Sequence, residues 1–151
     1  MTDYQKPLPI PSLESRPFWD ACRRGELVIQ RCDQCSAFVF PPRPLCDVCL
    51  GTSLSWTRST GRGRVFSYVV YHRVYHQAFA PEIPYVVAIV ELDEGVRLLS
   101  NIVGCPPEQV RCELPVEVVF ERVTDDTTLF KFQPRPRSHI EGASPKERSP
   151  A

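Results

Sequence analysis

The sequence contains no apolar run that approaches the about 20 residues needed for a membrane-spanning helix. Its first segment, MTDYQKPLPIPSLESRP, has neither the basic start nor the apolar stretch of a secretory signal. It also lacks a Gly-x-x-x-x-Gly-Lys loop for phosphates, and it has only three histidines. We therefore expect a cytoplasmic protein with no membrane contact and no P-loop chemistry.

The formal net charge is zero, because 18 basic side chains balance 18 acidic ones. A neutral chain is poorly suited to bulk binding of polyanions, which argues against nucleic acid as the main partner. The two signs are nevertheless segregated: arginines dominate residues 22–64, and acidic side chains dominate residues 82–126. A local arginine cluster still suits one phosphorylated small molecule.

Four of the seven cysteines form two Cys-x-x-Cys pairs, Cys32/Cys35 and Cys46/Cys49, and residues 36–45 separate the pairs. Each pair places two thiols on one tight turn, and a hairpin between the pairs would close a tetrahedral shell of four thiolates. Such a shell leaves no open position for water or substrate, so we predict a structural Zn²⁺ site. Two disulfides, a redox pair and an iron centre are the alternatives that the same spacing leaves open.

A short helix is predicted before the cysteine pairs. Ser15 suits its N-cap, Pro17 its first turn and Gly25 its C-terminal exit. Phe18 and Cys22 are spaced i, i+4, so both side chains would share one buried face. We therefore expect Cys22 to be a core residue and not a reactive thiol.

From Leu54 onward the sequence has β-type segments and no helical pattern. We interpret residues 61–63 (Gly-Arg-Gly) as a break or bulge in a strand and residues 93–95 (Asp-Glu-Gly) as a hairpin turn. These segments predict a mainly β protein, in which a short N-terminal helix and a rubredoxin-like four-cysteine zinc ribbon precede a five-stranded OB-fold barrel. The expected divisions are an N-terminal arm and helix (1–26), the zinc ribbon (27–53), the OB-fold (54–134) and a disordered tail (135–151).

Three motifs, in this order of parts, resemble a known family. They are RCDQC at residues 31–35 followed by FPPRPLCDVC at 40–49, then GRG at 61–63 and VELDEG at 90–95. Over residues 15–134 the chain resembles the zinc-ribbon OB-fold family known as domain of unknown function thirty-five. Members of that family are similar to small subunits of thiolase-fold enzymes, which include thiolases, acyltransferases and the aldolases that cleave β-hydroxyacyl-CoA side chains in steroid breakdown.

The resemblance implies a non-catalytic accessory subunit in a hetero-oligomer. It would dock on a thiolase-like large subunit through its ribbon and helix, and its barrel would face the acyl-CoA and help to bind or channel it. The choice of acyl group, and of a thiolytic, aldolytic or condensing reaction, would lie in the partner.

A few residues are candidates for these contacts. For the phosphates of CoA we expect Arg62, Arg64 and Arg73, because guanidinium groups pair bidentately with phosphate. Exposed aromatic loops on a rigid barrel are common contact surfaces, and the loop of residues 74–84 is of that kind. Closing the barrel end is the alternative role for the phenylalanine of that loop. The expected partner contacts are Phe18, Trp19, Tyr75, His76 and Phe79.

Two other classes of function compete with this one. A single-stranded nucleic-acid-binding module would use the arginines together with Tyr68, Tyr71 and Tyr75 as stacking platforms. The acidic second half of the chain counts against it. An independent thiol enzyme would use Cys105 or Cys112. We expect no catalytic set in this chain alone, because core or surface roles suit its single cysteines and histidines better.

Overall fold

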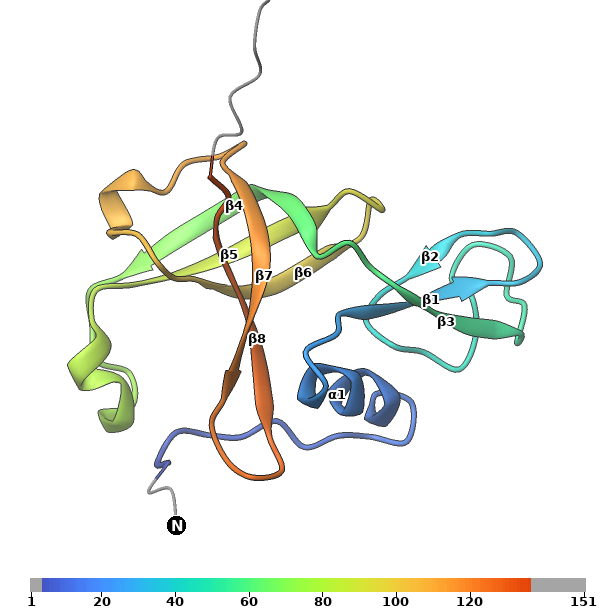
Figure 1. The fold of residues 1–151 in the computed structure, drawn as a ribbon, viewed down its shortest axis with the longest axis horizontal. Coiled ribbons are helices and arrows are strands. Elements are labelled where there is room, and N and C mark those ends of the chain that lie inside the picture. Colours follow the sequence, from blue (N-terminus) through green and yellow to red (C-terminus); the bar gives the residue numbers. More distant parts are fainter. Residues whose placement is uncertain (1–3, 137–151) are drawn as a thin grey trace, which may run out of the picture.

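The structure, a computed structural model, describes residues 4–136 and divides them between a small ribbon and a closed barrel (Figure 1). Most of the predicted disordered tail, residues 137–151, lies outside the described part. No helix within residues 4–136 is long and apolar enough to cross a membrane. The elements are α1 (Arg16–Arg23), β1 (Val28–Cys32), β2 (Phe38–Val39), β3 (Leu54–Arg58), β4 (Arg62–Tyr71), the 3₁₀ turn η1 (Gln77–Glu82), β5 (Tyr85–Leu92), β6 (Arg97–Ile102), the 3₁₀ turn η2 (Pro107–Gln109), β7 (Pro115–Arg122) and β8 (Thr128–Pro134).

Helix α1 lies where the sequence predicts it, but its N-terminal cap differs. Pro17 lies in the first turn, and Gly25 leaves the helix with a φ of 75°. Ser15 occupies the N-cap position, yet its hydroxyl makes no cap bond and instead accepts a 2.9 Å hydrogen bond from the backbone N–H of Ser12. Cys22 is fully buried, and burial raises the pKa of its thiol to about 12, which confirms its core role.

The ribbon is a three-stranded sheet in the order β2-β1-β3. Strand β3 pairs with β1 along its whole length, from Arg58 opposite Val28 to Leu54 opposite Cys32. Residues 54–58, which the sequence assigns to the barrel, therefore belong to the ribbon sheet. Alternation of apolar and polar residues identifies a strand but does not identify its pairing partner, so the sequence does not show that this strand pairs with β1.

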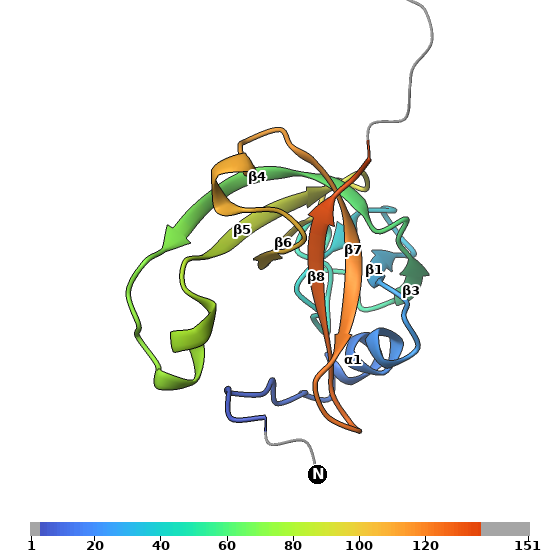
Figure 2. The same ribbon diagram turned by 60° about the vertical axis from the view of Figure 1, so that its left-hand side comes forward.

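Five strands close a barrel in the order β4-β5-β6-β8-β7, which confirms the predicted five-stranded OB-like architecture (Figure 2). The ring closes through an antiparallel pairing of β4 with β7 and a short parallel contact of β6 with β8 at Ile102 and Phe132. Every strand sends buried side chains inward, among them the fully buried Val65, Leu98, Val116 and Phe132. The barrel is therefore filled by a packed core.

Residues 61–63 lie at the predicted break, because β3 ends at Arg58, β4 begins at Arg62, and Gly61 between them has a left-handed φ of 70°. The register of β4 against β5 shifts between Val65 and Ser67, so the bulge lies beyond these glycines. Gly63 instead lets two strands approach, because a Cβ at this position would lie 2.3 Å from the backbone oxygen of Glu91 on β5. Close approach of the two backbones explains this glycine.

Helix α1 packs beside β8, between the barrel and the ribbon (Figure 1). The ring of Phe18 lies 5.5 Å from that of Phe40, which follows β2, and 5.3 Å from that of Phe130 in β8. The proline-rich arm ahead of the helix runs across the turn end of the β7–β8 hairpin, and Lys6 forms an ion pair with Glu82 of η1. The aromatic cluster joins helix, ribbon and barrel into one packed unit.

Candidate metal centre and docking surface

The two Cys-x-x-Cys turns meet beyond the end of β1. The sulfur atoms of Cys32, Cys35, Cys46 and Cys49 all lie within 4.8 Å of one another. The Sγ–Sγ distances Cys32–Cys49 and Cys35–Cys46 are both 3.6 Å, and all four are free thiols rather than disulfides. Four sulfurs held at about 2.3 Å from a central ion in a tetrahedron would lie about 3.8 Å apart. The set therefore fits a four-thiolate metal site.

Each turn has the compact geometry of a metal-binding knuckle, although neither carries glycine after its second cysteine. Ser36 and Leu50 both adopt a left-handed backbone, with φ of 62° and 61°. Their backbone N–H groups donate to the carbonyl oxygens of Cys32 and Cys46, at 2.9 and 3.0 Å, which closes each turn. The N–H of Val48 donates to Cys46 Sγ at 3.4 Å, an outer interaction of the kind that orients a metal ligand.

Hydrogen bonds outside the sulfur cluster hold the first knuckle against β3. Asp33 accepts hydrogen bonds from the hydroxyls of Ser53 and Ser55, at 2.6 and 2.7 Å, and they hold the pKa of its carboxyl below its usual range. The backbone N–H of Cys35 lowers the pKa of the Cys32 thiol, whereas burial and the neighbouring sulfurs raise the pKa of the Cys35 thiol. Four thiolates this close to one another therefore need a cation between them. Sequence reasoning missed Asp33 and its serines, because they meet only after β1 has paired with β3.

An apolar patch covers the outer surface of β4, β5 and β6. Cross-strand partners there point away from the core: Val69 pairs with Val87, and Ile89 pairs with Leu99. Leu99 is 67% exposed and Val69 is 52% exposed, although both side chains are aliphatic. We call these four residues the outer face. A contiguous apolar patch of this kind is typical of an interaction surface.

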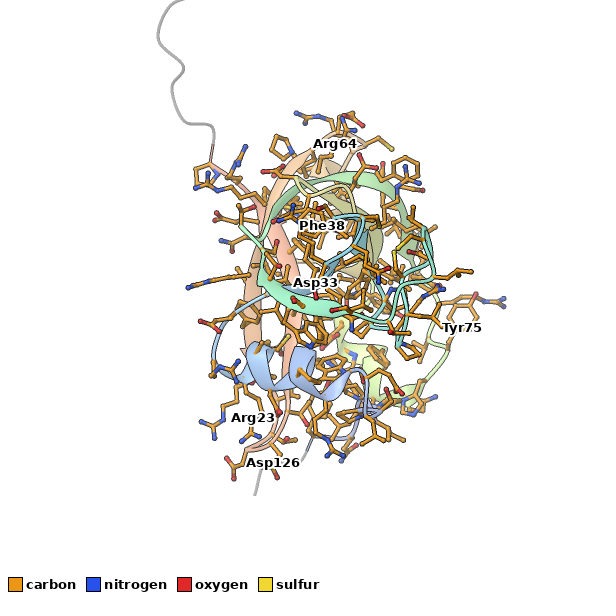
Figure 3. All side chains as sticks on the ribbon, turned by 90° about the vertical axis from the view of Figure 1, so that its right-hand side faces the viewer. Arg23, Asp33, Phe38, Arg64, Tyr75 and Asp126 are labelled. Atoms are coloured by element: carbon orange, nitrogen blue, oxygen red, sulfur yellow. The ribbon has the colours of Figure 1, made fainter. Side chains whose placement is uncertain are left out.

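The outer face continues into an aromatic groove at the end of β4. The rings of Tyr71 and Tyr85 stack with centroids 5.1 Å apart, and the ring of Tyr75 packs edge-on against Tyr71 at 5.7 Å. Phe79 lies 5.6 Å from Tyr85 and, with Val87 of the outer face, lines a groove of about 480 Å³. Figure 3 shows Tyr75 at the edge of the molecule, where it projects into solvent. The two loop aromatics predicted as partner contacts thus share one groove.

The other predicted partner contacts are placed differently. Phe18 is only 2% exposed, so the structure corrects its prediction as a contact residue: it belongs to the aromatic core. Its spacing with other buried helix positions was the signal for burial, and it outweighs aromatic character. Trp19 is half-buried, with its ring 6.0 Å from that of Phe130. His76 is exposed, and its Nδ1 accepts a hydrogen bond from the N–H of Ala78 at the start of η1.

The three arginines predicted to bind CoA phosphates do not form one site. Arg64 already pairs with two carboxylates, Glu91 at 2.7 Å and Glu113 at 2.8 Å. Arg62 lies with Arg64 at the beginning of β4, whereas Arg73 follows the other end of that strand, beside the aromatic groove. Arg64 lines a separate cavity of about 420 Å³, but Glu91, Asp93 and Glu113 also line it, and their negative charges oppose a phosphate. Arg73 is therefore the better placed of these two arginines for a nucleotide.

Because of the carboxylate of Glu91, we expect the stability of the barrel to fall at acid pH. Hydrogen bonds from Arg64 and Arg97 hold its pKa below the usual value. A depressed pKa in the folded state contributes stability above the unfolded-state value, and this stability is lost as the pH falls through the folded-state pKa. We expect Glu91→Gln to lower the urea midpoint at about pH 7 and to lower it by less at about pH 3, measured by circular dichroism.

The matched control for this experiment is Glu108→Gln, at an exposed carboxylate that makes no ion pair within residues 4–136. It should leave the urea midpoint unchanged at both pH values. An equal loss of stability for Glu91→Gln at neutral and acid pH would contradict the ion-pair explanation.

The alternative sites have less structural support. Burial raises the pKa of the Cys105 thiol, which disfavours the nucleophilic thiolate, while Cys112 is exposed. Within the described residues, the four-cysteine cluster is the only group of three or more histidine, cysteine or acidic side chains that could share a metal. Tyr68 packs against the barrel core, so it does not form a common stacking surface with Tyr71 and Tyr75.

Comparison with known proteins adds a family to these observations. Residues 19–55 match the family described as ChsH2, rubredoxin-like zinc ribbon domain. Residues 56–121 match the family described as ChsH2, C-terminal OB-fold domain. The boundary between the two matches falls inside β3, the strand that completes the ribbon sheet.

Two relatives and one solved structure are similar over most of this chain. A DUF35 domain-containing scaffold protein of Methanocaldococcus jannaschii is 38% identical over 72% of this chain and 81% of its own length. A probable enoyl-CoA hydratase alpha subunit of Thermomonospora curvata is 37% identical over 85% of this chain, which spans only 40% of that relative. The structure described as Ltp2-ChsH2(DUF35) aldolase matches at 37% identity and a TM-score of 0.78, over 84% of this chain and 98% of the matched one. The chain therefore belongs to the DUF35 family, and within it to the ChsH2 type that joins a rubredoxin-like zinc ribbon to an OB-fold.

Proposed function

We propose that the chain is a non-catalytic accessory subunit, which docks on a larger thiolase-like enzyme and helps to bind that enzyme's acyl-CoA substrate. The names of similar proteins support an association with enzymes: one is a hydratase alpha subunit, and one structure is described as an aldolase with a DUF35 component. This chain spans 40% of the length of the hydratase subunit. In this proposal a separate large subunit supplies the catalytic site.

The outer face is the observation that carries this proposal. Its aliphatic side chains, such as Leu99 at 67% exposure, gain about 25 cal/mol for each Å² of apolar surface that a partner covers. At one end the strands carry the ion pair of Glu91 with Arg97, at 2.9 Å, and at the other they lead into the aromatic groove. An apolar centre with a polar rim is the usual anatomy of a protein–protein interface.

The aromatic groove is the part of this surface that suits the nucleotide end of acyl-CoA. Stacking of a base on an aromatic ring contributes about 1–3 kcal/mol, and Tyr75 offers an exposed ring. Arg73 lies beside the groove and can pair with a phosphate, whereas Arg64 is occupied by two carboxylates. The groove would then bind the nucleotide end of acyl-CoA, while the partner enzyme binds the acyl group.

In this proposal the metal is a structural Zn²⁺ held by Cys32, Cys35, Cys46 and Cys49. A bound ion supplies cross-linking of the two knuckles, and four thiolates leave no coordination position for substrate. The ribbon can then keep its shape while it contacts a partner.

Affinity capture with the tagged full-length chain, from a lysate of its native source, tests the proposal. We expect mass spectrometry to identify a thiolase-like enzyme among the captured proteins, and acyl-CoA turnover by that enzyme to rise when the chain is added. Leu99→Asp should weaken the captured complex about tenfold or more, because it would bury an unpaired charge in an apolar interface. Surface plasmon resonance with the purified enzyme measures this change.

Gln109→Asp is the matched control, since it adds the same charge at an exposed position of η2, outside the outer face. It should bind the enzyme as the wild type does. Capture of nucleic acid that is released at high salt, with no acyl-CoA enzyme, would contradict the proposal and favour the nucleic-acid-binding alternative.

A further inference from the structure

The second knuckle exposes an unusual amount of apolar surface for a metal-binding turn. Val48 is 70% exposed, Leu50 is 71% exposed, and Leu45 just before the knuckle is 40% exposed. None of the three belongs to either hydrophobic cluster of the described residues. We call Leu45, Val48 and Leu50 the knuckle tip. These side chains neither complete a core nor bind the metal.

The backbone conformation at position 50 is unfavourable for leucine, so this residue destabilises the folded knuckle. Its φ of 61° is left-handed, a conformation in which the Cβ of an ordinary L-residue is crowded and glycine or asparagine is preferred. The corresponding position of the first knuckle, with φ of 62°, is filled by the small polar Ser36. Glycine at position 50 would give a more relaxed knuckle and would remove an exposed aliphatic group. A residue that is unfavourable for the fold at a solvent-exposed site indicates a use for its side chain.

We propose that the knuckle tip is a docking knob that inserts into an apolar pocket of the larger subunit. This inference rests on the function proposed above and adds a second contact to the outer face. Charge narrows the kind of partner: the one charged side chain within residues 44–53 (PLCDVCLGTS) is Asp47, and Arg43, just before them, is a single positive charge beside it. Nucleic acid and anionic lipid surfaces both require positive charge, so an apolar protein pocket is the occupant that fits.

The metal site explains why a knuckle suits this task. The tip residues alternate with Cys46 and Cys49, and the knuckle is closed by the bond from the N–H of Leu50 to the carbonyl oxygen of Cys46, at 3.0 Å. Side chains on a turn fixed by a metal lose little conformational freedom on binding, which strengthens association. The knob is therefore preorganised by the same four cysteines that stabilise the ribbon.

Two glycine substitutions separate docking from folding. Leu50→Gly relaxes the left-handed backbone and removes the apolar side chain, while Ser36→Gly relaxes the same conformation in the first knuckle and leaves the tip intact. We expect both variants to retain zinc and to unfold at the same temperature as the wild type or higher. We expect only Leu50→Gly to bind the large subunit more weakly, by about tenfold, which is the usual effect of losing one buried aliphatic side chain.

The probe in this experiment is the purified large subunit identified by affinity capture, titrated against each full-length variant in a calorimeter. Val48→Ser is the second variant, and its loss of affinity should add to that of Leu50→Gly. Wild-type affinity for Leu50→Gly and Val48→Ser, with Leu99→Asp still weak, would overturn the knob and leave the proposed function standing. Failure of the wild type itself to bind would overturn both. Self-association that Leu50→Gly abolishes would replace the large subunit by a second copy as the occupant.

Discussion

Cys46→Ser is expected to abolish zinc binding and to unfold the knuckle end of the ribbon. The buried cluster of the ribbon consists of Cys32, Val39 and Cys46, so two of its three members are metal ligands. Little apolar burial is left to hold this end without the ion, whereas structural zinc contributes on the order of 10–16 kcal/mol in zinc-finger peptides. The larger core, which joins the barrel to α1 and to Ile29 of the ribbon, contains none of the four ligand cysteines and should stay folded. Elemental analysis should show a fall from about one zinc per chain to near zero, and calorimetry an early transition before the barrel unfolds.

Cys112→Ser is the control, because it removes an exposed thiol that lies outside the metal cluster. Its zinc content and its unfolding profile should equal those of the wild type, and a chelator added to the wild type should reproduce the Cys46→Ser profile. Elemental analysis also distinguishes zinc from iron, which the same four thiolates would bind. Full zinc content in Cys46→Ser, together with one unchanged transition, would contradict the structural metal site.

Phe18→Ala is expected to lower the free energy of unfolding by about 3–5 kcal/mol, as large-to-small substitutions of buried aromatics do. The ring is 2% exposed and makes edge-on contacts with Trp19 at 5.3 Å, Phe40 at 5.5 Å and Phe130 at 5.3 Å. It joins three elements, so the cavity left by its removal would loosen the helix from both the ribbon and the barrel. Urea unfolding followed by tryptophan fluorescence measures the effect.

Tyr75→Ala is the counterpart in the aromatic groove, where the residue is 73% exposed. Removing an exposed side chain should change the free energy of unfolding by about 0.5 kcal/mol or less. The same variant should weaken the binding of acyl-CoA or of the large subunit if the groove has its proposed role. A loss of stability for Tyr75→Ala as large as that for Phe18→Ala would contradict the different burial of the two residues.

The two proposed contact surfaces share a physical property, which is rigidity. The outer face is carried by paired strands of a closed barrel, and the knuckle tip is carried by a turn that four cysteines fix around a metal. Rigid surfaces lose little entropy on association, so a small subunit can bind firmly with few contact residues. In the proposed function, association of this kind would let a small subunit take part in the reaction of a larger enzyme.

The metal site shows which features can be predicted from local sequence and which cannot. The two Cys-x-x-Cys pairs predict the ligand set directly, because two thiols on one tight turn are close in almost any arrangement of the rest of the chain. The outer hydrogen bonds from Ser53 and Ser55 to Asp33 are not predictable in this way, because they depend on the register of β3 against β1. The left-handed φ of Leu50 was also hidden, since a glycine at that position would have been the ordinary signal.

Sequence alone determined the order of the parts, the four-cysteine site, the buried face of α1 and the number of barrel strands, because each of these follows from local spacing and period. Tertiary structure alone decided that β3 joins the ribbon, that Phe18 is core while Tyr75 is exposed, and that Arg64 is neutralised by Glu91 and Glu113. The type of an apolar or charged residue does not show whether its side chain faces the core, a partner protein or an opposite charge. Only the pairing of distant strands settles which of these neighbours each side chain meets.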